Sequence, residues 1–242
     1  MKLPFAVFAT CIRLLNVTLA TAQREGADAQ QNLDALGGAG SNLVRTFDTR
    51  YDGIRGTPFL LPYWCSTEVV FKDGRRFSTV PLKYDVYQNQ VVIKRPQGDS
   101  VILNAAPVSY FTMQDIITGK SYVFRKFLLP PGDQAQLKDK FLQVIQEGST
   151  SLVVSRSKAI VKADYKGGYN AGRPYDELID DTQYYLLRPD GSLAGIRLNR
   201  KSVLEAFTKH QAEIKAYAQQ ENIDFKNVNA VGKLVAYANS LN

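Results

Sequence analysis

Short alternating segments, separated by turn residues, fill residues 67–127 and limit the folds that this chain can adopt. Residues 69–71 and 77–79 flank an Asp73-Gly74 turn, and Leu82, Tyr84 and Val86 alternate with polar neighbours. Strands of about four to seven residues, with turn residues roughly every 8–12 residues, are typical of antiparallel sheets. Because consecutive strands usually pair with their neighbours, the pattern predicts an antiparallel β-meander or partial barrel.

The strand pattern continues beyond a Pro-Pro-Gly break at residues 130–132, where we place a domain boundary. Residues 141–145 fit either a strand or a short helix. Residues 152–156 and 159–163 predict a second hairpin joined at Ser157-Lys158. Residues 184–187 and 193–198 predict a third, and its Asp190-Gly191 pair tolerates the positive φ that a tight turn needs.

The spacing of apolar residues changes at Asn199. One helix is predicted from Asn199 or Ser202 to Asn222, and a second from Asn227 or Asn229 onward. Two amphipathic helices after many strands indicate an α+β protein whose helices cover a sheet face or end. We therefore predict a β-meander over residues 43–128, and hairpins with a C-terminal helical pair over residues 129–242, packed as one unit.

The N-terminus has the parts of a secretory signal peptide. Residues 1–22 combine a basic start, a mostly apolar run and small residues before Gln23. Arg13 and Asn16 interrupt the run, so it is a poor membrane span and the chain is not expected to be an integral membrane protein. The alternative is an amphipathic first helix of the mature protein. Residues 23–42 are small and polar and predict a flexible leader.

Export is consistent with the cysteine content. After cleavage at residue 22, Cys65 is the single cysteine left, and it cannot form an internal disulfide. This favours a bacterial periplasm or cell surface. Cys65 follows Trp64 in an apolar stretch, so we expect a buried small hydrophobe rather than a nucleophile.

The sequence offers little reactive chemistry. His210 is the one histidine, and we expect it on the solvated side of a helix, so we predict no catalytic residue, metal site or cofactor. Residues 176–181 form an acidic cluster whose spacing does not match a calcium loop. The formal charge of +7 is spread thinly among acidic residues, and it predicts no nucleic-acid partner.

Aromatic side chains give the candidate binding residues. A platform for a sugar or a partner protein could be formed by Tyr63, Trp64, Tyr84, Tyr87, Tyr184 and Tyr185. Tyr84 and Tyr87 have opposite parity on one strand, so at most one of them can face the core. The alternative is that most of these rings pack in the core or at a sheet edge.

Several segments resemble a family of uncharacterised exported proteins of Bacteroidota. They are residues 56–60 (GTPFL), 69–75 (VVFKDGR), 80–87 (VPLKYDVY), 213–217 (EIKAY), 221–223 (ENI) and 234–239 (LVAYAN). The resemblance covers most of residues 43–242 and rests on turn and packing motifs. It implies a location in the cell envelope and supplies no catalytic residues. Cys65 departs from the pattern.

These observations favour a non-catalytic binding or scaffold protein of the envelope, whose partner is an envelope protein or a glycan. The alternative is a hydrolase that acts on envelope glycans through paired carboxylates, which can lie far apart in the sequence. Two carboxyl groups lining one cleft would support that alternative.

Overall fold

The computed structural model describes residues 44–45, 51–95, 98–130, 134–164 and 174–241. An antiparallel sheet of 11 strands runs through them in the order β1-β5-β4-β3-β2-β6-β7-β8-β9-β12-β13, and a two-stranded sheet pairs β10 with β11. Together with the C-terminal helices, this confirms the predicted α+β class. The elements are β1 (Val44–Arg45), β2 (Cys65–Phe71), β3 (Arg76–Asp85), β4 (Gln90–Lys94), β5 (Ser100–Ile102), β6 (Val108–Gln114), β7 (Ser121–Arg125), η1 (Ala135–Leu137), β8 (Leu142–Gln146), β9 (Ser151–Ser155), β10 (Lys158–Val161), β11 (Glu177–Asp180), β12 (Gln183–Leu187), β13 (Leu193–Ile196), α2 (Arg200–Glu205), α3 (Gln211–Gln220) and α4 (Val228–Ser240).

The sheet grows outward from β2 in both directions. β3, β4 and β5 follow on one side, and β6 to β9 follow on the other, so sequence neighbours pair as predicted. Gly74, at φ 88°, closes the β2–β3 turn and donates its N–H to the carbonyl of Phe71 at 3.0 Å. The sheet stays open, with β1 and β13 at its edges.

Aromatic rings fill the core of the first half of the sheet. Tyr84, Phe111, Phe124 and Phe141 are all at most 1% exposed. Their ring centroids lie 4.9–6.2 Å apart, mostly edge to face, which adds favourable ring contacts to the burial of apolar area. The Tyr84 hydroxyl donates to Asn89 Oδ1 at 2.7 Å, so its one buried polar group is satisfied.

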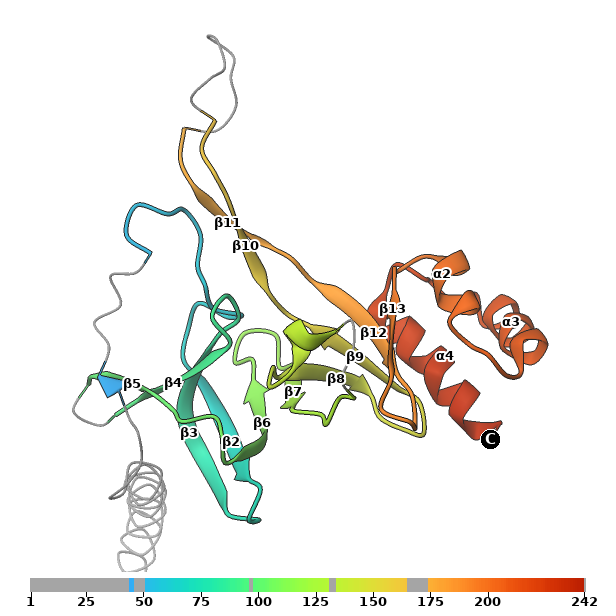
Figure 1. Ribbon diagram of the computed structural model, residues 1–242, viewed down its shortest axis with the longest axis horizontal. Helices are drawn as coiled ribbons and strands as arrows, with labels where there is room; N and C mark the ends of the chain where they lie inside the picture. The colour runs from blue at the N-terminus through green and yellow to red at the C-terminus, as the bar shows by residue number, and fades with distance from the viewer. Residues whose placement is uncertain (1–43, 46–50, 96–97, 131–133, 165–173, 242) are drawn as a thin grey trace, which may run out of the picture.

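The helices cover the other end of the sheet (Figure 1). α4 packs on β8 and β9, and α3 packs on α4. Leu152 and Leu186 of the sheet and Val231 and Leu234 of α4 are at most 1% exposed within this second core. A third cluster around Tyr185 and Val153 occupies the opposite face of the same strands.

The predicted helical pair is three helices. The expected helix from Asn199 to Asn222 is interrupted between Glu205 and Gln211, because His210 adopts a left-handed backbone with φ 53°. Asn199 and Asn227 cap α2 and α4 as predicted, each accepting a backbone N–H at 2.9 Å. Phe207, within the break, and Ile214 of α3 still reach the same core.

The predicted hairpin of residues 152–163 is wrong. β9 pairs with β8 and β12, whereas β10 pairs with β11. β10 and β11 thus form a narrow arm that projects from the body of the molecule (Figure 1). Residues 51–56 run beside this arm, where the Arg55 N–H donates to the carbonyl of Asp176 at 2.9 Å.

The predicted signal peptide (residues 1–22) and flexible leader (residues 23–42) lie outside the described residues. Among the helices that the structure describes, none has the length and apolar character needed to cross a membrane.

Candidate functional site

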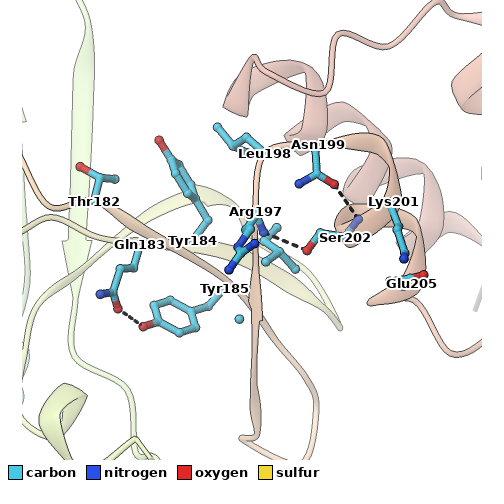
Figure 2. A pocket seen from close by; sticks show the side chains of 12 residues that line it. Thr182, Gln183, Tyr184, Tyr185, Arg197, Leu198, Asn199, Lys201, Ser202 and Glu205 are labelled. Carbon is cyan, nitrogen blue, oxygen red and sulfur yellow. Dashed lines mark hydrogen bonds between the residues drawn. The ribbon is translucent and has the colours of Figure 1, made fainter.

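A surface concavity of about 720 Å³ lies where β12 begins, β13 ends and α2 starts (Figure 2). Cavities of roughly 300–1,000 Å³ are typical of ligand sites. It is lined by Thr182, Gln183, Tyr184, Tyr185, Gly195, Ile196, Arg197, Leu198, Asn199, Lys201, Ser202 and Glu205. We take it as the candidate functional site.

Strand register and a helix cap position these side chains. In the β12–β13 ladder Tyr184 lies opposite Ile196, on the side of the sheet that the helices cover. The chain then turns into α2 at Asn199, whose Oδ1 accepts the Ser202 N–H at 2.9 Å. Ser202 Oγ in turn accepts the Arg197 N–H at 2.9 Å. These two bonds hold the corner between β13 and α2 (Figure 2).

The concavity carries more hydrogen-bond donors than acidic groups. Arg197 and Lys201 are exposed, and no described carboxylate forms an ion pair with either of them. Glu205 is the one carboxylate in the lining. Guanidinium and ammonium groups donate to hydroxyl or anionic oxygens, and amide side chains can both donate and accept. The lining is therefore suited to a polar ligand.

Tyr184 and Tyr185 point to opposite faces of β12, as neighbours on a strand must. The Tyr184 ring is half-buried at the edge of the second core. Tyr185 is 5% exposed in the third cluster, and its hydroxyl donates to Gln183 Oε1 at 2.5 Å (Figure 2). Burial raises the pKa of Tyr185, and the charge of Asp181 adds to the shift. Tyr184 is thus the ring available to a ligand in the concavity.

Tyr63 and Trp64 lie elsewhere, beside the start of β2. The Tyr63 hydroxyl donates to Asp115 Oδ1 at 2.5 Å, and this bond is the main cause that raises the pKa of Tyr63 to about 12. The Lys83 ammonium lies 5.1 Å from the Trp64 ring centroid, a cation–π contact. Both aromatic rings are half-buried and already engaged by their neighbours.

Tyr84 and Tyr87 also have different roles. Tyr84 is 1% exposed in the aromatic core, so it offers no surface to a ligand. Tyr87, at 38% exposed, contacts Tyr51 edge to face with centroids 5.9 Å apart. The Tyr51 hydroxyl donates to Asp85 Oδ2 at 2.8 Å. The six predicted aromatic residues therefore do not form one platform.

The other residues singled out in the sequence lie apart from the concavity. Cys65 is buried as expected, at 1% exposed, and burial is the main cause that raises its pKa. The acidic stretch is partly neutralised along the arm, where Asp176 pairs with Lys162 at 2.7 Å and Asp180 pairs with Lys158 at 2.9 Å. In the described part of the chain, no group of three or more histidine, cysteine or acidic side chains could hold a metal.

His210 is exposed, but it precedes α3 instead of lying on a helix face. Its Nδ1 atom is 3.6 Å from Glu213 Oε1, one turn along the helix. It also lines a second cavity, of about 340 Å³, beside Arg188 and Lys209.

Sequence reasoning missed the polar side of the concavity. Gln183 lies on β12, Arg197 directly follows β13 and Lys201 lies on α2, and they become neighbours only when the β12–β13 hairpin packs against α2. Comparison with known proteins found no match to a protein family, a curated protein or a solved structure.

Proposed function

We propose that this chain is an exported, non-catalytic binding protein of the cell envelope that holds a glycan in the concavity between β12, β13 and α2. Support for export comes from residues 1–22, with their basic start, apolar run and small residues before Gln23. Support for binding comes from the concavity, whose volume of about 720 Å³ suits a ligand of a few rings.

One observation carries the choice of a glycan. Tyr184, Asn199 and Arg197 all line the concavity, and the Tyr184 ring is half-buried there. A sugar presents an apolar face of C–H groups to an aromatic ring and a rim of hydroxyls to amide and guanidinium groups. The phenol ring supplies apolar area at low conformational cost, and the polar side chains fix the orientation of the ligand.

Three cavities of the described structure give no support to the alternative of a glycan hydrolase. A glycosidase needs two carboxylates roughly 5–10 Å apart in one cleft. The concavity has Glu205 alone, the 340 Å³ cavity has no carboxylate, and a third cavity of about 230 Å³ has Asp180 alone. The Asp180 carboxylate is paired with Lys158.

The binding test compares two site variants with a charge control on the full chain. We expect Tyr184→Ala and Arg197→Gln each to weaken binding of soluble envelope glycan fragments roughly tenfold, measured by titration calorimetry. Lys120→Gln, at the exposed β6–β7 turn, is the control and should bind normally. Equal affinity in all four proteins, the wild type and the three variants, would refute the site.

Export is tested by the N-terminal residue of the protein recovered from the source cells, which should be Gln23.

A further inference from the structure

A second cavity, of about 340 Å³, shares no lining residue with the glycan concavity. It lies between the end of β12, the segment of residues 206–210 and the C-terminal end of α4. Its volume is near the lower limit for ligand sites, so it suits a small molecule. Its lining divides into an apolar floor and a basic rim.

Core side chains make the floor. Leu186 of β12, Phe207 between α2 and α3, and Ile214 of α3 line the cavity and are 1%, 6% and 2% exposed. All three belong to the second core, so their positions are fixed by packing. A ligand that covers this floor gains from the removal of apolar surface from water.

Three basic side chains, Arg188, Lys209 and His210, make the rim. The Arg188 guanidinium donates from Nη2 to the carbonyl of Ala206 at 3.4 Å, which holds it beside the cavity and leaves its other N–H groups for a ligand. Lys209 is exposed, and no described carboxylate forms an ion pair with it. Hydroxyl groups of Ser149, Thr150 and Thr208 complete the polar side.

Acidic groups stand outside the cavity. Glu213 lies 3.6 Å from His210 Nδ1, one turn along α3, and it is not part of the lining. Asp190 accepts the Ser192 N–H at 2.9 Å. Its hydrogen bonds with Ser192 are the main cause that lowers the pKa of Asp190, and the charge of Arg188 adds to the shift. Because no carboxylate lines the cavity, the rim has an excess of positive charge that a bound anion would balance.

We propose that this cavity binds a small anionic amphiphile. Its phosphate or carboxylate group would meet Arg188, Lys209 and His210, and its apolar chain or ring would cover Leu186, Phe207 and Ile214. Both halves of the ligand are required by the lining, since a free anion would leave the floor in water and an uncharged chain would leave the rim unbalanced.

The test uses octyl phosphate, inorganic phosphate and octanol as three probes on the full chain, by titration calorimetry at low ionic strength. We expect octyl phosphate to bind at least roughly tenfold more tightly than either of the other two. Arg188→Gln and Lys209→Gln should each weaken octyl phosphate binding roughly tenfold, because each removes a charge-assisted contact. Lys201→Gln, in the glycan concavity, is the matched control and should bind octyl phosphate normally.

Two results would overturn the proposal. One is octyl phosphate binding that is unchanged in both rim variants, and the other is inorganic phosphate or octanol binding as tightly as octyl phosphate. His210→Gln separates an effect on binding from an effect on folding, because the His210 side chain is exposed and belongs to no core cluster. It should weaken octyl phosphate binding, while the unfolding midpoint stays unchanged.

Discussion

At the scale of single residues, Asp115 organises the end of the β6–β7 hairpin. Its carboxylate accepts the Thr118 hydroxyl at 2.5 Å, the Tyr63 hydroxyl at 2.5 Å and the N–H of Ile117 at 2.9 Å. The Thr118 and Tyr63 hydroxyl bonds are the main causes that hold the pKa of Asp115 well below its usual range. One carboxylate thereby fixes a turn that presents Ile116 and Ile117 at 67% and 72% exposure.

This network predicts a pH-dependent stability. Because the folded pKa of Asp115 is depressed, its contribution is complete above the unfolded value of about 4 and is lost as the pH falls through the folded value. Asp115→Asn should be less stable than the wild type at neutral pH, and the difference should narrow below about pH 4. Urea unfolding at several pH values measures it. A difference that stays constant down to about pH 2 would contradict the assignment.

The sequence predicted part of this residue-level picture. Strand parity required that at most one of Tyr84 and Tyr87 face the core, and Tyr84 does so. Parity could not say which one, since that depends on where β3 ends, and Tyr87 lies beyond its last residue, Asp85. The sequence makes Tyr184 a candidate binding residue. It does not indicate Arg197 and Lys201, because exposed basic residues are common on protein surfaces and neither belongs to a motif.

At the scale of elements, Asn239 ties α4 to the turn between β8 and β9. Its Oδ1 accepts the Ser149 hydroxyl and the Thr150 N–H, both at 2.9 Å, and its Nδ2 donates to the Thr150 carbonyl at 2.8 Å. Gly148 makes room for this amide, because a Cβ atom there would lie 2.1 Å from Nδ2.

Gly148→Ala should therefore displace the Asn239 amide and lower the free energy of unfolding by about 1–3 kcal/mol, through the loss of its hydrogen bonds. Gly195→Ala is the matched control, since a Cβ there would be 3.7 Å from Tyr185 Cε1, an ordinary contact. We expect it to cost less than about 1 kcal/mol. Denaturant unfolding of both variants gives the comparison, and equal losses would show that the crowding at Gly148 is relieved without cost.

Element types were predictable, whereas partners and breaks were not. Residues 152–163 alternate as strands do, but the partners of β9 and β10 come from distant parts of the chain. The Asp73-Gly74 and Asp190-Gly191 turns each hold a glycine at positive φ, whereas neither Ser157 nor Lys158 has positive φ. Two-residue hairpin loops need positive φ, which residues other than glycine seldom adopt. The residue types Ser157 and Lys158 therefore already argued against the predicted turn. The break at His210 had no comparable signal, because non-glycine residues seldom adopt that conformation.

At the scale of the whole molecule, consecutive residues anchor the clusters to one another. Phe141 belongs to the aromatic core and Leu142 to the cluster around Tyr185. Leu152 belongs to the helix-covered core and Val153 again to the Tyr185 cluster. A strand cannot leave one cluster without disturbing the next, and the β7–β8 ladder also joins the two halves of the sheet.

We therefore expect one cooperative unfolding transition. The chain contains a single tryptophan, Trp64, which reports on the first half of the sheet, whereas the helices that dominate far-ultraviolet circular dichroism lie at the other end. Urea titrations followed by Trp64 fluorescence and by circular dichroism should give coincident midpoints. Midpoints that separate would show two independently stable domains, divided near the Pro-Pro-Gly break.

The closed environment of Cys65 has a practical consequence. A thiol that is 1% exposed, and whose pKa burial has raised, reacts slowly with reagents that attack thiolates. It is the one cysteine in the described part of the chain. In a chain that begins at Gln23, a cysteine introduced at Thr182 or Thr208 could therefore carry a fluorophore or spin label selectively, without removal of the Cys65 thiol. Each of the two cavities could then be given its own reporter, and occupancy of one could be followed while the other is being filled.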